Sequence, residues 1–356
     1  MHLNNTPVII KKIRRVMNNF WTEPLRIDNL VIPRFMAAPL DGVTDSPLRQ
    51  VIREFSKEEL LMTEMRHVAH VAHEKEPRSL KYTQVEHPLA YQVSANRVQD
   101  IDTAVEKIIA NGFKMLNLNC GCPSPTVTKS GSGSALMADL PRLKELLLHF
   151  NRSINGRIPF TLKIRAGYKF KNAVEVAKLA QDCGVSCLMI HPRTAPEGFT
   201  SRLDFDIVRE VKEALTIPVI FSGNVNNFER AKKTHELTGV DGFMIGRALW
   251  GAPWKLKEIT EAAQGRQFTI STGEMVRYAL QNFHLNIEHY GERVGFNSFK
   301  KQVAQYIRNV DGAAEWRKKL LTSQTAPIMQ EYLEALASTY ASTPPTVAPT
   351  NQGIGL

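Results

Sequence analysis

Short apolar runs alternate with amphipathic stretches along most of the chain. Eight of these runs are nearly continuous in Ile, Leu, Met and Val, as strands buried on both faces should be. The predicted strands are Arg34–Pro39, Leu60–Met65, Leu89–Ala95, Met115–Cys120, Phe160–Arg165, Cys187–His191, Pro218–Asn224 and Gly242–Gly246. Between them, segments such as Asp100–Ala110 place their apolar residues at helical spacing, which predicts helices packed on the strands.

Eight strands that are each followed by a helix predict a (β/α)8 barrel of the TIM type over residues 28–258. An open, doubly wound sheet is the alternative. That alternative is disfavoured because no G-x-G-x-x-G loop follows the first predicted strand. The barrel is therefore the predicted fold of the larger domain.

The pattern changes after Trp254. No strand-like run occurs between Gly273 and Tyr340, so residues 270–341 are predicted to form an all-helical C-terminal domain. Its predicted helices are Glu274–His289, Ser298–Arg308, Ala313–Leu321 and Ile328–Ser338. Residues 342–356 are rich in Pro and Thr and predict a disordered tail. Residues 1–27 form a predicted N-terminal extension, in which the basic stretch Val8–Trp21 suits either a helix or a flexible arm.

Charge and composition narrow the class of protein. The net charge of +10 and the pI near 9.4 favour a polyanionic partner such as nucleic acid or an anionic membrane surface, although a basic solvated face is a common alternative. No segment approaches the roughly 20 apolar residues that span a bilayer, and no secretory signal is present. Four cysteines in 356 residues indicate a reducing compartment, so a cytoplasmic protein is expected. No second Cys/His pair accompanies Cys120 and Cys122, so no metal is expected.

Polar residues gather where the predicted strands end, which is where barrel enzymes place their chemistry. Gly223 and Gly246 in the last two strand-end turns, with Arg247 beside them, predict a phosphate cradle, although glycine turns also serve left-handed backbone. Lys163 in a barrel mouth needs an anion or an electron-rich ring such as a flavin, or else a carboxylate. His191 suits a flavin contact or an ordinary strand-end histidine equally.

Cys122 lies in a Gly-Cys-Pro-Ser turn, and a Ser/Gly-rich loop over residues 129–134 follows it. A thiol on such a loop, interpreted as a mobile lid, suits a general acid because its reference pKa of about 8.5 keeps it protonated at neutral pH. The alternative is a small buried apolar residue, which fits Cys183 and Cys187. The strand position of Cys120 also favours packing, and a spare thiol is the alternative for that residue.

Seven motifs occur in an order that resembles the bacterial, FMN-dependent tRNA-dihydrouridine synthase family. They are MAAPLDGVTDSPLR (36–49), LNLNCGCPS (116–124), GSGSALM (131–137), TLKIRAG (161–167), IHPRT (190–194), PVIFSGNV (218–225) and DGFMIGRALWGAPW (241–254). The segment around Phe299–Lys301 is similar to the helical RNA-binding domain of these enzymes.

The resemblance implies an FMN cofactor, electrons from NADPH, and reduction of the C5–C6 bond of specific uridines in tRNA. A monomer is expected. A flipped-out uridine would take hydride from flavin N5 at C6 and a proton from Cys122 at C5. The implied flavin-binding residues are Pro39, Leu40, Asp41, Gln92, Asn119, Lys163, His191, Ser222, Gly223, Asn224, Gly246 and Arg247. The implied RNA-binding residues are Arg193, Lys300, Lys301 and Arg308.

Three motifs depart from the family pattern. Ser222-Gly223-Asn224 stands where Asn-Gly-Asp is usual, which weakens the assignment of Ser222, and Pro192 replaces a glycine and removes one backbone donor. Leu40 replaces a methionine, a conservative change. The alternatives are an FMN barrel reductase of a free pyrimidine, the same chemistry on ribosomal RNA, and a non-catalytic RNA-binding barrel.

Overall fold

A closed barrel of eight parallel strands forms the larger domain. The structure is a computed structural model, and it describes residues 20–75, 78–198, 200–308 and 310–347. The barrel strands are β3 (Phe35–Ala37), β4 (Leu61–His67), β5 (Leu89–Ser94), β6 (Met115–Cys120), β7 (Phe160–Gly167), β8 (Cys187–Thr194), β9 (Val219–Phe221) and β10 (Gly242–Ile245). Their order is β3-β10-β9-β8-β7-β6-β5-β4, and the Ala37 amide closes the ring by donating to the Leu60 carbonyl at 3.0 Å. The predicted (β/α)8 fold is confirmed.

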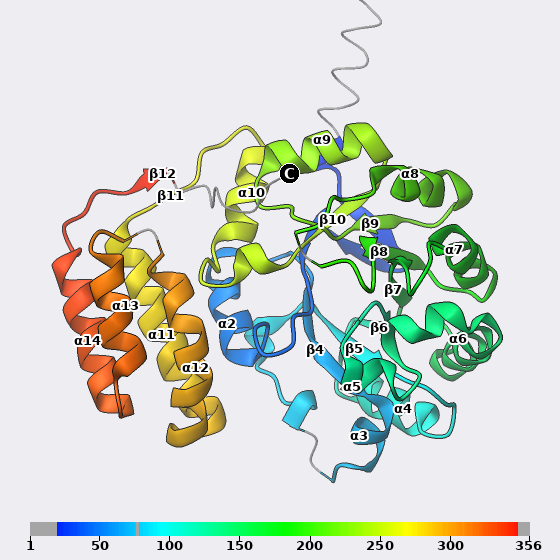
Figure 1. Cartoon of the computed structure of the whole chain (residues 1–356), viewed down its shortest axis with the longest axis horizontal. Helices are drawn as coiled ribbons and strands as arrows, with labels where there is room; N and C mark the ends of the chain where they lie inside the picture. The colour runs from blue at the N-terminus through cyan, green and yellow to red at the C-terminus, as the bar shows by residue number, and fades with distance from the viewer. Residues whose placement is uncertain (1–19, 76–77, 199, 309, 348–356) are drawn as a thin grey trace, which may run out of the picture.

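One helix after each strand covers the outside of the barrel (Figure 1). These helices are α2 (Ser46–Phe55), α3 (Val68–His73), α4 (Ile101–Ala110), α6 (Leu140–Ile154), α7 (Ala173–Asp182), α8 (Phe205–Ala214), α9 (Phe228–Thr238) and α10 (Lys255–Ala263). Shorter turns of helix lie in the loops: η1 (Arg78–Leu80), η2 (Gln84–Glu86), α5 (Pro125–Thr128), η3 (Gly133–Ala138) and η4 (Arg247–Leu249).

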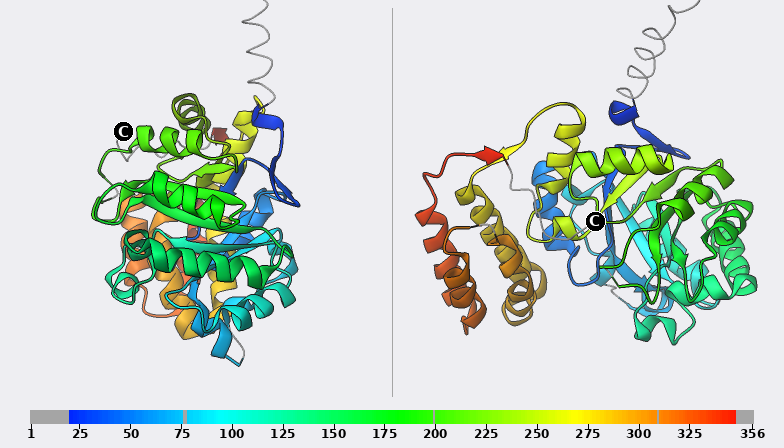
Figure 2. Two further views of the ribbon diagram at one scale, coloured as in Figure 1. Left: turned by 90° about the vertical axis from the view of Figure 1, so that its right-hand side faces the viewer. Right: turned by 45° about the horizontal axis from the view of Figure 1, so that its top comes forward.

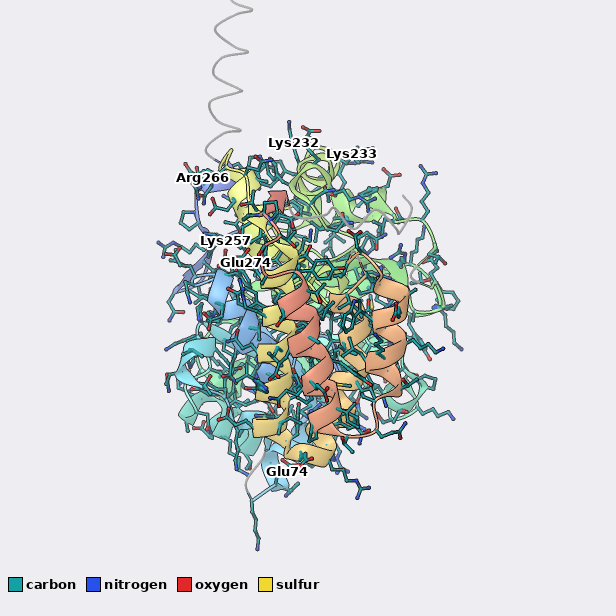
Figure 3. All side chains as sticks on the ribbon, turned by 90° about the vertical axis from the view of Figure 1, so that its left-hand side faces the viewer. Glu74, Lys232, Lys233, Lys257, Arg266 and Glu274 are labelled. Carbon is teal, nitrogen blue, oxygen red and sulfur yellow. The ribbon has the colours of Figure 1, made fainter. Side chains whose placement is uncertain are left out.

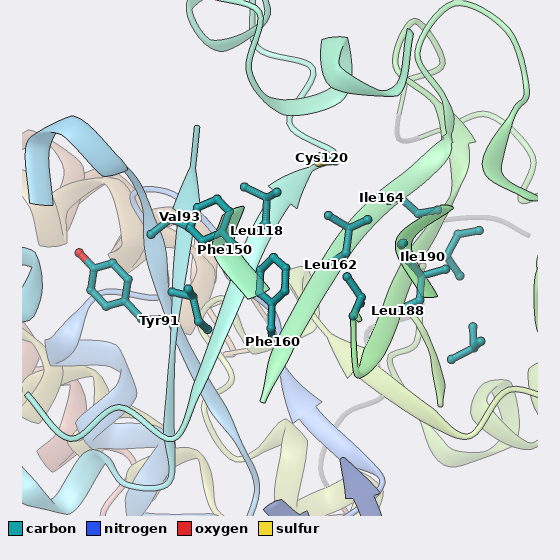
Figure 4. Close-up of a cluster of buried hydrophobic side chains, with 14 of the residues drawn as sticks. Tyr91, Val93, Leu118, Cys120, Phe150, Phe160, Leu162, Ile164, Leu188 and Ile190 are labelled. Atoms are coloured by element: carbon teal, nitrogen blue, oxygen red, sulfur yellow. The ribbon is translucent and has the colours of Figure 1, made fainter. Parts of the chain in front are cut away.

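Alternation along β6 separates packing from chemistry. Leu118 and Cys120 point outward into the layer between strands and helices, where Phe150 of α6 and Phe160 also lie (Figure 4). Asn117 and Asn119 point the other way, into the barrel, because successive side chains of a strand face opposite sides. Cys120 is therefore a packing residue, as predicted, and burial raises the pKa of its thiol.

A hairpin that the sequence pattern does not reveal closes the bottom of the barrel. Its strands, β1 (Leu25–Ile27) and β2 (Leu30–Ile32), pair antiparallel, and Figure 2 shows this dark-blue hairpin beside the barrel. Its apolar side chains join a methionine-rich cluster at the strands' N-terminal ends, which includes Met36, Met115 and Met244. The predicted boundary between residues 27 and 28 is therefore wrong, because it cuts this hairpin. Most of the Val8–Trp21 stretch lies outside the described residues.

The C-terminal domain is a separate bundle with its own core. Its helices are α11 (Thr272–Tyr290), α12 (Glu292–Tyr306), α13 (Ala313–Thr322) and α14 (Ala326–Thr339). Helix α12 begins before the predicted Ser298 because Gly295 lets it approach α11: a Cβ there would lie 2.3 Å from the Asn286 carbonyl oxygen. Figure 1 shows the bundle beside α2, with α11 packed against that helix.

Part of the predicted tail is ordered. Strand β12 (Thr346–Val347) pairs with β11 (Thr269–Ile270). The prediction of disorder is therefore wrong for Thr346 and Val347. Composition could not reveal this, because the pairing is made by the backbone. Residues 348–356 lie outside the described part. Lys257 of α10 and Arg266 of the linker after it, both labelled in Figure 3, lie near the junction of the two domains. Each pairs with Glu261 of α10. No helix of the described residues combines the length and apolar character needed to cross a membrane.

Candidate active site

Asn119 fixes the Cys122 turn at the end of β6. Its Oδ1 accepts the Gly121 amide at 3.0 Å and the Cys122 amide at 2.8 Å. From the other side, the Ser134 amide and hydroxyl both donate to the Cys122 carbonyl at 3.0 Å. Ser132 and Ser134 are buried, so the part of the loop interpreted as a mobile lid is packed at this point. The Cys122 thiol, which is half-buried, therefore projects from a rigid turn.

Gly133 is required for this closure. Its φ is +61°, a backbone conformation that favours glycine. A Cβ at this position would also lie 2.7 Å from the Cys122 carbonyl oxygen. A larger residue would consequently displace the turn that carries the thiol.

A chain of side-chain amides crosses the barrel interior beside Cys122. Asn119 donates to Gln92 at 2.9 Å, and Gln92 donates to Asn117 at 2.7 Å. Asn117 then donates to the Thr161 hydroxyl at 2.9 Å. All four side chains are buried, so this network determines which way each amide points. Asn117 and Thr161 were not among the predicted site residues, although the MLNLNC alternation places Asn117 on the same face as Asn119.

Two cations of β7 enter the same space. Arg165 donates through Nε to the Gly121 carbonyl at 2.7 Å and through Nη1 to the Thr194 carbonyl at 2.9 Å, so it also supports the Cys122 turn. Lys163 makes no hydrogen bond or ion pair within the described part of the chain. Burial, followed by the charge of Arg165, lowers the pKa of Lys163 to about 8. This interior cation suits an electron-rich or anionic ligand.

His191 is held as a neutral imidazole within β8. Its Nδ1 donates to the Ser222 carbonyl at 2.5 Å, since a carbonyl can only accept. Burial, with the positive charges of Lys163 and Arg165, holds the pKa of His191 well below its usual range. The Nε2 atom therefore carries a lone pair rather than a proton.

Arg193 does not have the predicted role in RNA binding. Its side chain is 1 % exposed, and its Nε and Nη2 donate to the Ser201 carbonyl at 2.8 and 2.5 Å. The prediction failed because an arginine after a strand-end histidine gives no sign of which way it turns. Here it anchors the loop after β8 from inside the protein.

The ends of β9 and β10 bring two predicted phosphate ligands into contact. Arg247 donates through Nη2 to Asn224 Oδ1 at 2.7 Å, and Asn224 has a φ of +51°. Burial, followed by the charge of Arg247, lowers the pKa of Arg193, so the two guanidinium groups lie near each other. Gly223 has a packing role as well, because a Cβ there would approach Phe221 and Pro192 at 3.2 Å. The local excess of positive charge suits an anion such as a phosphate.

The loop after β3 forms the remaining edge. Leu40 is half-buried, and its amide donates to the Thr44 hydroxyl at 2.8 Å. Asp41 is exposed and pairs loosely with Arg66 of β4 at 3.5 Å. Pro39 and Leu40 thus border the mouth directly, whereas the Asp41 carboxylate faces outward.

Comparison with known proteins places the chain in a family. The dihydrouridine synthase family matches residues 36–340. The chain belongs to this family. The tRNA-dihydrouridine synthase B of Vibrio parahaemolyticus is 30 % identical over 328 residues, covering 88 % of this chain and 97 % of that one. A probable tRNA-dihydrouridine synthase of Rickettsia conorii is 31 % identical over 304 residues, covering 82 % of this chain and 90 % of that protein.

Solved structures agree on the fold of this family member. The old yellow enzyme homologue from Zymomonas mobilis superimposes with a TM-score of 0.51 at 13 % identity, covering 65 % of this chain and 90 % of that chain. At that identity the likeness concerns the barrel alone.

The predicted RNA-binding residues of the helical domain lie apart from the barrel site. Lys301 and Arg308 are exposed. Lys300 is half-buried, and its Nζ donates to the Ser323 carbonyl at 2.7 Å, so it connects α12 to the end of α13. Lys300 therefore has a structural role that the sequence did not indicate.

Proposed function

We propose that this chain is a tRNA-dihydrouridine synthase that binds FMN, takes electrons from NADPH and reduces the C5–C6 bond of specific uridines in tRNA, with Cys122 as the proton donor. Family membership and the similarity to tRNA-dihydrouridine synthases support the reaction and the tRNA substrate. The arrangement of side chains around Cys122 supports the cofactor and the role of the thiol.

The residues at the barrel mouth fit a flavin mononucleotide. Lys163 is an interior cation for which the described residues supply no carboxylate, and such a cation matches the electron-rich edge of an isoalloxazine ring. Asn224, Arg247 and the two glycines beside them suit a phosphate. Bound FMN would supply hydride chemistry at this place. The residues that would hold its ring are Pro39, Leu40, Asp41, Gln92, Asn119, Lys163 and His191, and those that would hold its phosphate are Ser222, Gly223, Asn224, Gly246 and Arg247.

The chain's own residues position the reaction. Cys122 holds a proton on Sγ at the mouth, and Asn119 together with Arg165 keeps its turn in place before substrate arrives. A uridine must leave its stack to reach this depth, as in other enzymes that act on a base. The thiol then delivers its proton to C5 of the uracil. The observation that carries this proposal is the half-buried Cys122 in a rigid turn beside Lys163, an interior lysine that pairs with no described residue.

The deciding experiment uses the purified full-length protein, NADPH and an unmodified tRNA transcript. We expect the protein to release FMN on denaturation, and the digested tRNA to contain a nucleoside heavier than uridine by two hydrogen atoms. Free uracil and ribosomal RNA serve as competing acceptors, and NADH as a competing donor. Faster reduction of free uracil than of tRNA would instead support a free-pyrimidine reductase, and preferential reduction of ribosomal RNA would change the substrate. A protein that takes up no flavin would contradict the proposal.

A further inference from the structure

The loop after β7 presents an aromatic ring to solvent. Phe170 is 76 % exposed, more than any other large apolar side chain in the described part of the chain. It is also the sole aromatic residue among the exposed large apolar side chains there. A single exposed apolar side chain is common on protein surfaces, so the position and the neighbours of this ring decide whether it serves binding.

The loop that carries Phe170 is rigid. Gly167 and Lys171 form an antiparallel bridge across it, and a Cβ on Gly167 would lie only 1.8 Å from the Phe170 carbonyl oxygen. The Ala195 amide donates to the carbonyls of Gly167 and Tyr168, each at 3.1 Å. The backbone is therefore fixed at the base, while the ring of Phe170 stays outside.

The same loop is connected to the segment that positions Cys122. Asn172, directly after the loop, donates through Nδ2 to the Met137 carbonyl of η3 at 2.6 Å. Ser134 of η3 holds the Cys122 carbonyl. Strand β7, which leads into the loop, carries Lys163 and Arg165 on its inner face. Phe170 consequently lies at the rim of the mouth that contains the proposed proton donor.

Two lysines flank the ring, one without an acidic partner among the described residues and one beside acidic side chains. Lys169 and Lys171 flank Phe170 in the chain, and Lys169 is exposed and makes no ion pair or hydrogen bond within the described residues. Lys171 pairs with Asp204 at 2.6 Å and remains 55 % exposed. Glu197 is exposed nearby, and its carboxylate accepts the Thr194 amide and hydroxyl at 2.5 and 2.8 Å. Its charge, like that of Asp204, acts on Lys171 rather than leaving that lysine free. An exposed ring between lysines matches an unpaired base of RNA and its phosphates.

We propose that Phe170 is a stacking platform for an unpaired tRNA base next to the target uridine, and that Lys169 contacts an adjacent phosphate. This inference rests on the proposed function. A nucleotide neighbouring a flipped-out uridine loses a stacking partner, and the Phe170 ring at the rim replaces that partner. Phe170 thereby helps to hold the RNA while the uridine enters the barrel.

The test measures tRNA affinity and turnover for Phe170→Ala, Phe170→Leu and Phe170→Trp. We expect Phe170→Ala to weaken binding of unmodified tRNA by about tenfold, the lower part of the range for one stacked base. Phe170→Leu should remain weak and Phe170→Trp should recover, because stacking needs an aromatic face. Flavin content and NADPH oxidation without RNA should match the wild type in all three. Leu148→Ala on α6, another exposed apolar residue, is the control and should bind normally.

A second measurement separates stacking from general RNA affinity. Two tRNAs are compared, one with an abasic nucleotide just before the target uridine and one with it just after. The tRNA that lacks the stacked base should bind the wild type more weakly, and Phe170→Ala should bind that tRNA no more weakly than the wild type does. Lys169→Gln should lower the salt dependence of binding, log K against log salt, by about 0.7 to 0.9. If Phe170→Ala binds tRNA as tightly as the wild type, the stacking role of Phe170 is contradicted and the proposed function is not. A wild type that binds tRNA but forms no dihydrouridine would overturn the proposed function alone.

Discussion

Cys122, the proposed proton donor, and its neighbour Cys120 differ in what surrounds them. Cys122 is half-buried at the mouth, whereas Cys120 points into the helix layer. We expect Cys122→Ala to lower the rate of dihydrouridine formation at least 100-fold, because a general acid typically contributes roughly 10²–10⁴-fold to the rate. Flavin content and NADPH oxidation should stay unchanged. Cys120→Ala is the matched control, and loss of activity in that variant with a normal Cys122→Ala would contradict the assignment.

The buried charge of Lys163 should destabilise the folded apoprotein, although Lys163 belongs to the proposed FMN site. Its pKa of about 8, against 10.5 in the unfolded chain, means that the folded protein binds fewer protons between these values. Stability of the apoprotein therefore rises with pH through that window, and the full cost of the charge is present below it. Lys163→Met should stabilise the apoprotein at pH 7 by about 2 kcal/mol and weaken FMN binding.

Thermal unfolding of the apoprotein between pH 6 and about 10, together with flavin titration, checks both expectations. Lys178→Met on the exposed face of α7 is the control and should change neither. A Lys163→Met protein that is less stable and binds FMN normally would refute this role.

The sequence predicts where a site residue points when the residue lies inside a strand, because successive side chains of a strand alternate between its two faces. Asn119 and Lys163 lie on the inner face for that reason. Arg193 was assigned wrongly because it sits where the strand ends and its side chain turns back to the Ser201 carbonyl. Lys300 was likewise given only an external role, since its contact with Ser323 depends on how two helices meet.

At the scale of elements, the start of α2 joins the two domains. Asp45 caps this helix by accepting the Leu48 amide at 3.1 Å, and the Tyr290 hydroxyl of α11 donates to its other oxygen at 3.2 Å. Burial, with a smaller contribution from Glu64, raises the pKa of Asp45 to about 6. The folded protein therefore binds more protons than the unfolded chain between pH 3.8 and about 6, and stability falls as pH rises through this window.

Asp45→Asn should keep the cap and remove this pH dependence. We expect it to be about 1 kcal/mol more stable than the wild type at pH 7, since asparagine also caps helices well. Asp45→Ala should be less stable than Asp45→Asn, because it loses the cap. Melting temperatures from pH 4 to 7 measure both effects. An Asp45→Asn profile that keeps the wild-type slope would show that another group titrates in this window.

Long, periodic elements were predictable, and short ones were not. The barrel strands are buried on both faces, which leaves a continuous apolar signal in the sequence. The three-residue strands of the hairpin β1–β2 and the two-residue pairing of β11 with β12 are too short to show a period. The start of α12 was missed because two glycines, Gly291 and Gly295, weaken the helical pattern while one of them serves close packing.

At the scale of the whole molecule, the positive net charge predicts that tRNA binding depends on salt concentration. Lys301 and Arg308 are exposed on the helical domain, and their joint replacement by alanine should weaken tRNA binding and lower the salt dependence by about 1.5. Lys232→Ala with Lys233→Ala removes the same charge from α9 of the barrel, where Figure 3 shows both lysines. Equal losses in the two double variants would show that tRNA affinity follows total charge rather than the helical domain.

The hairpin beneath the barrel has a kinetic consequence. Because its apolar side chains fill the end opposite Cys122, the proposed electron donor and the proposed tRNA would enter the barrel by the same end and exclude each other from the proposed flavin. Initial rates at several fixed tRNA concentrations should consequently give parallel lines in double-reciprocal plots against NADPH. A large excess of either substrate should slow turnover by obstructing the other.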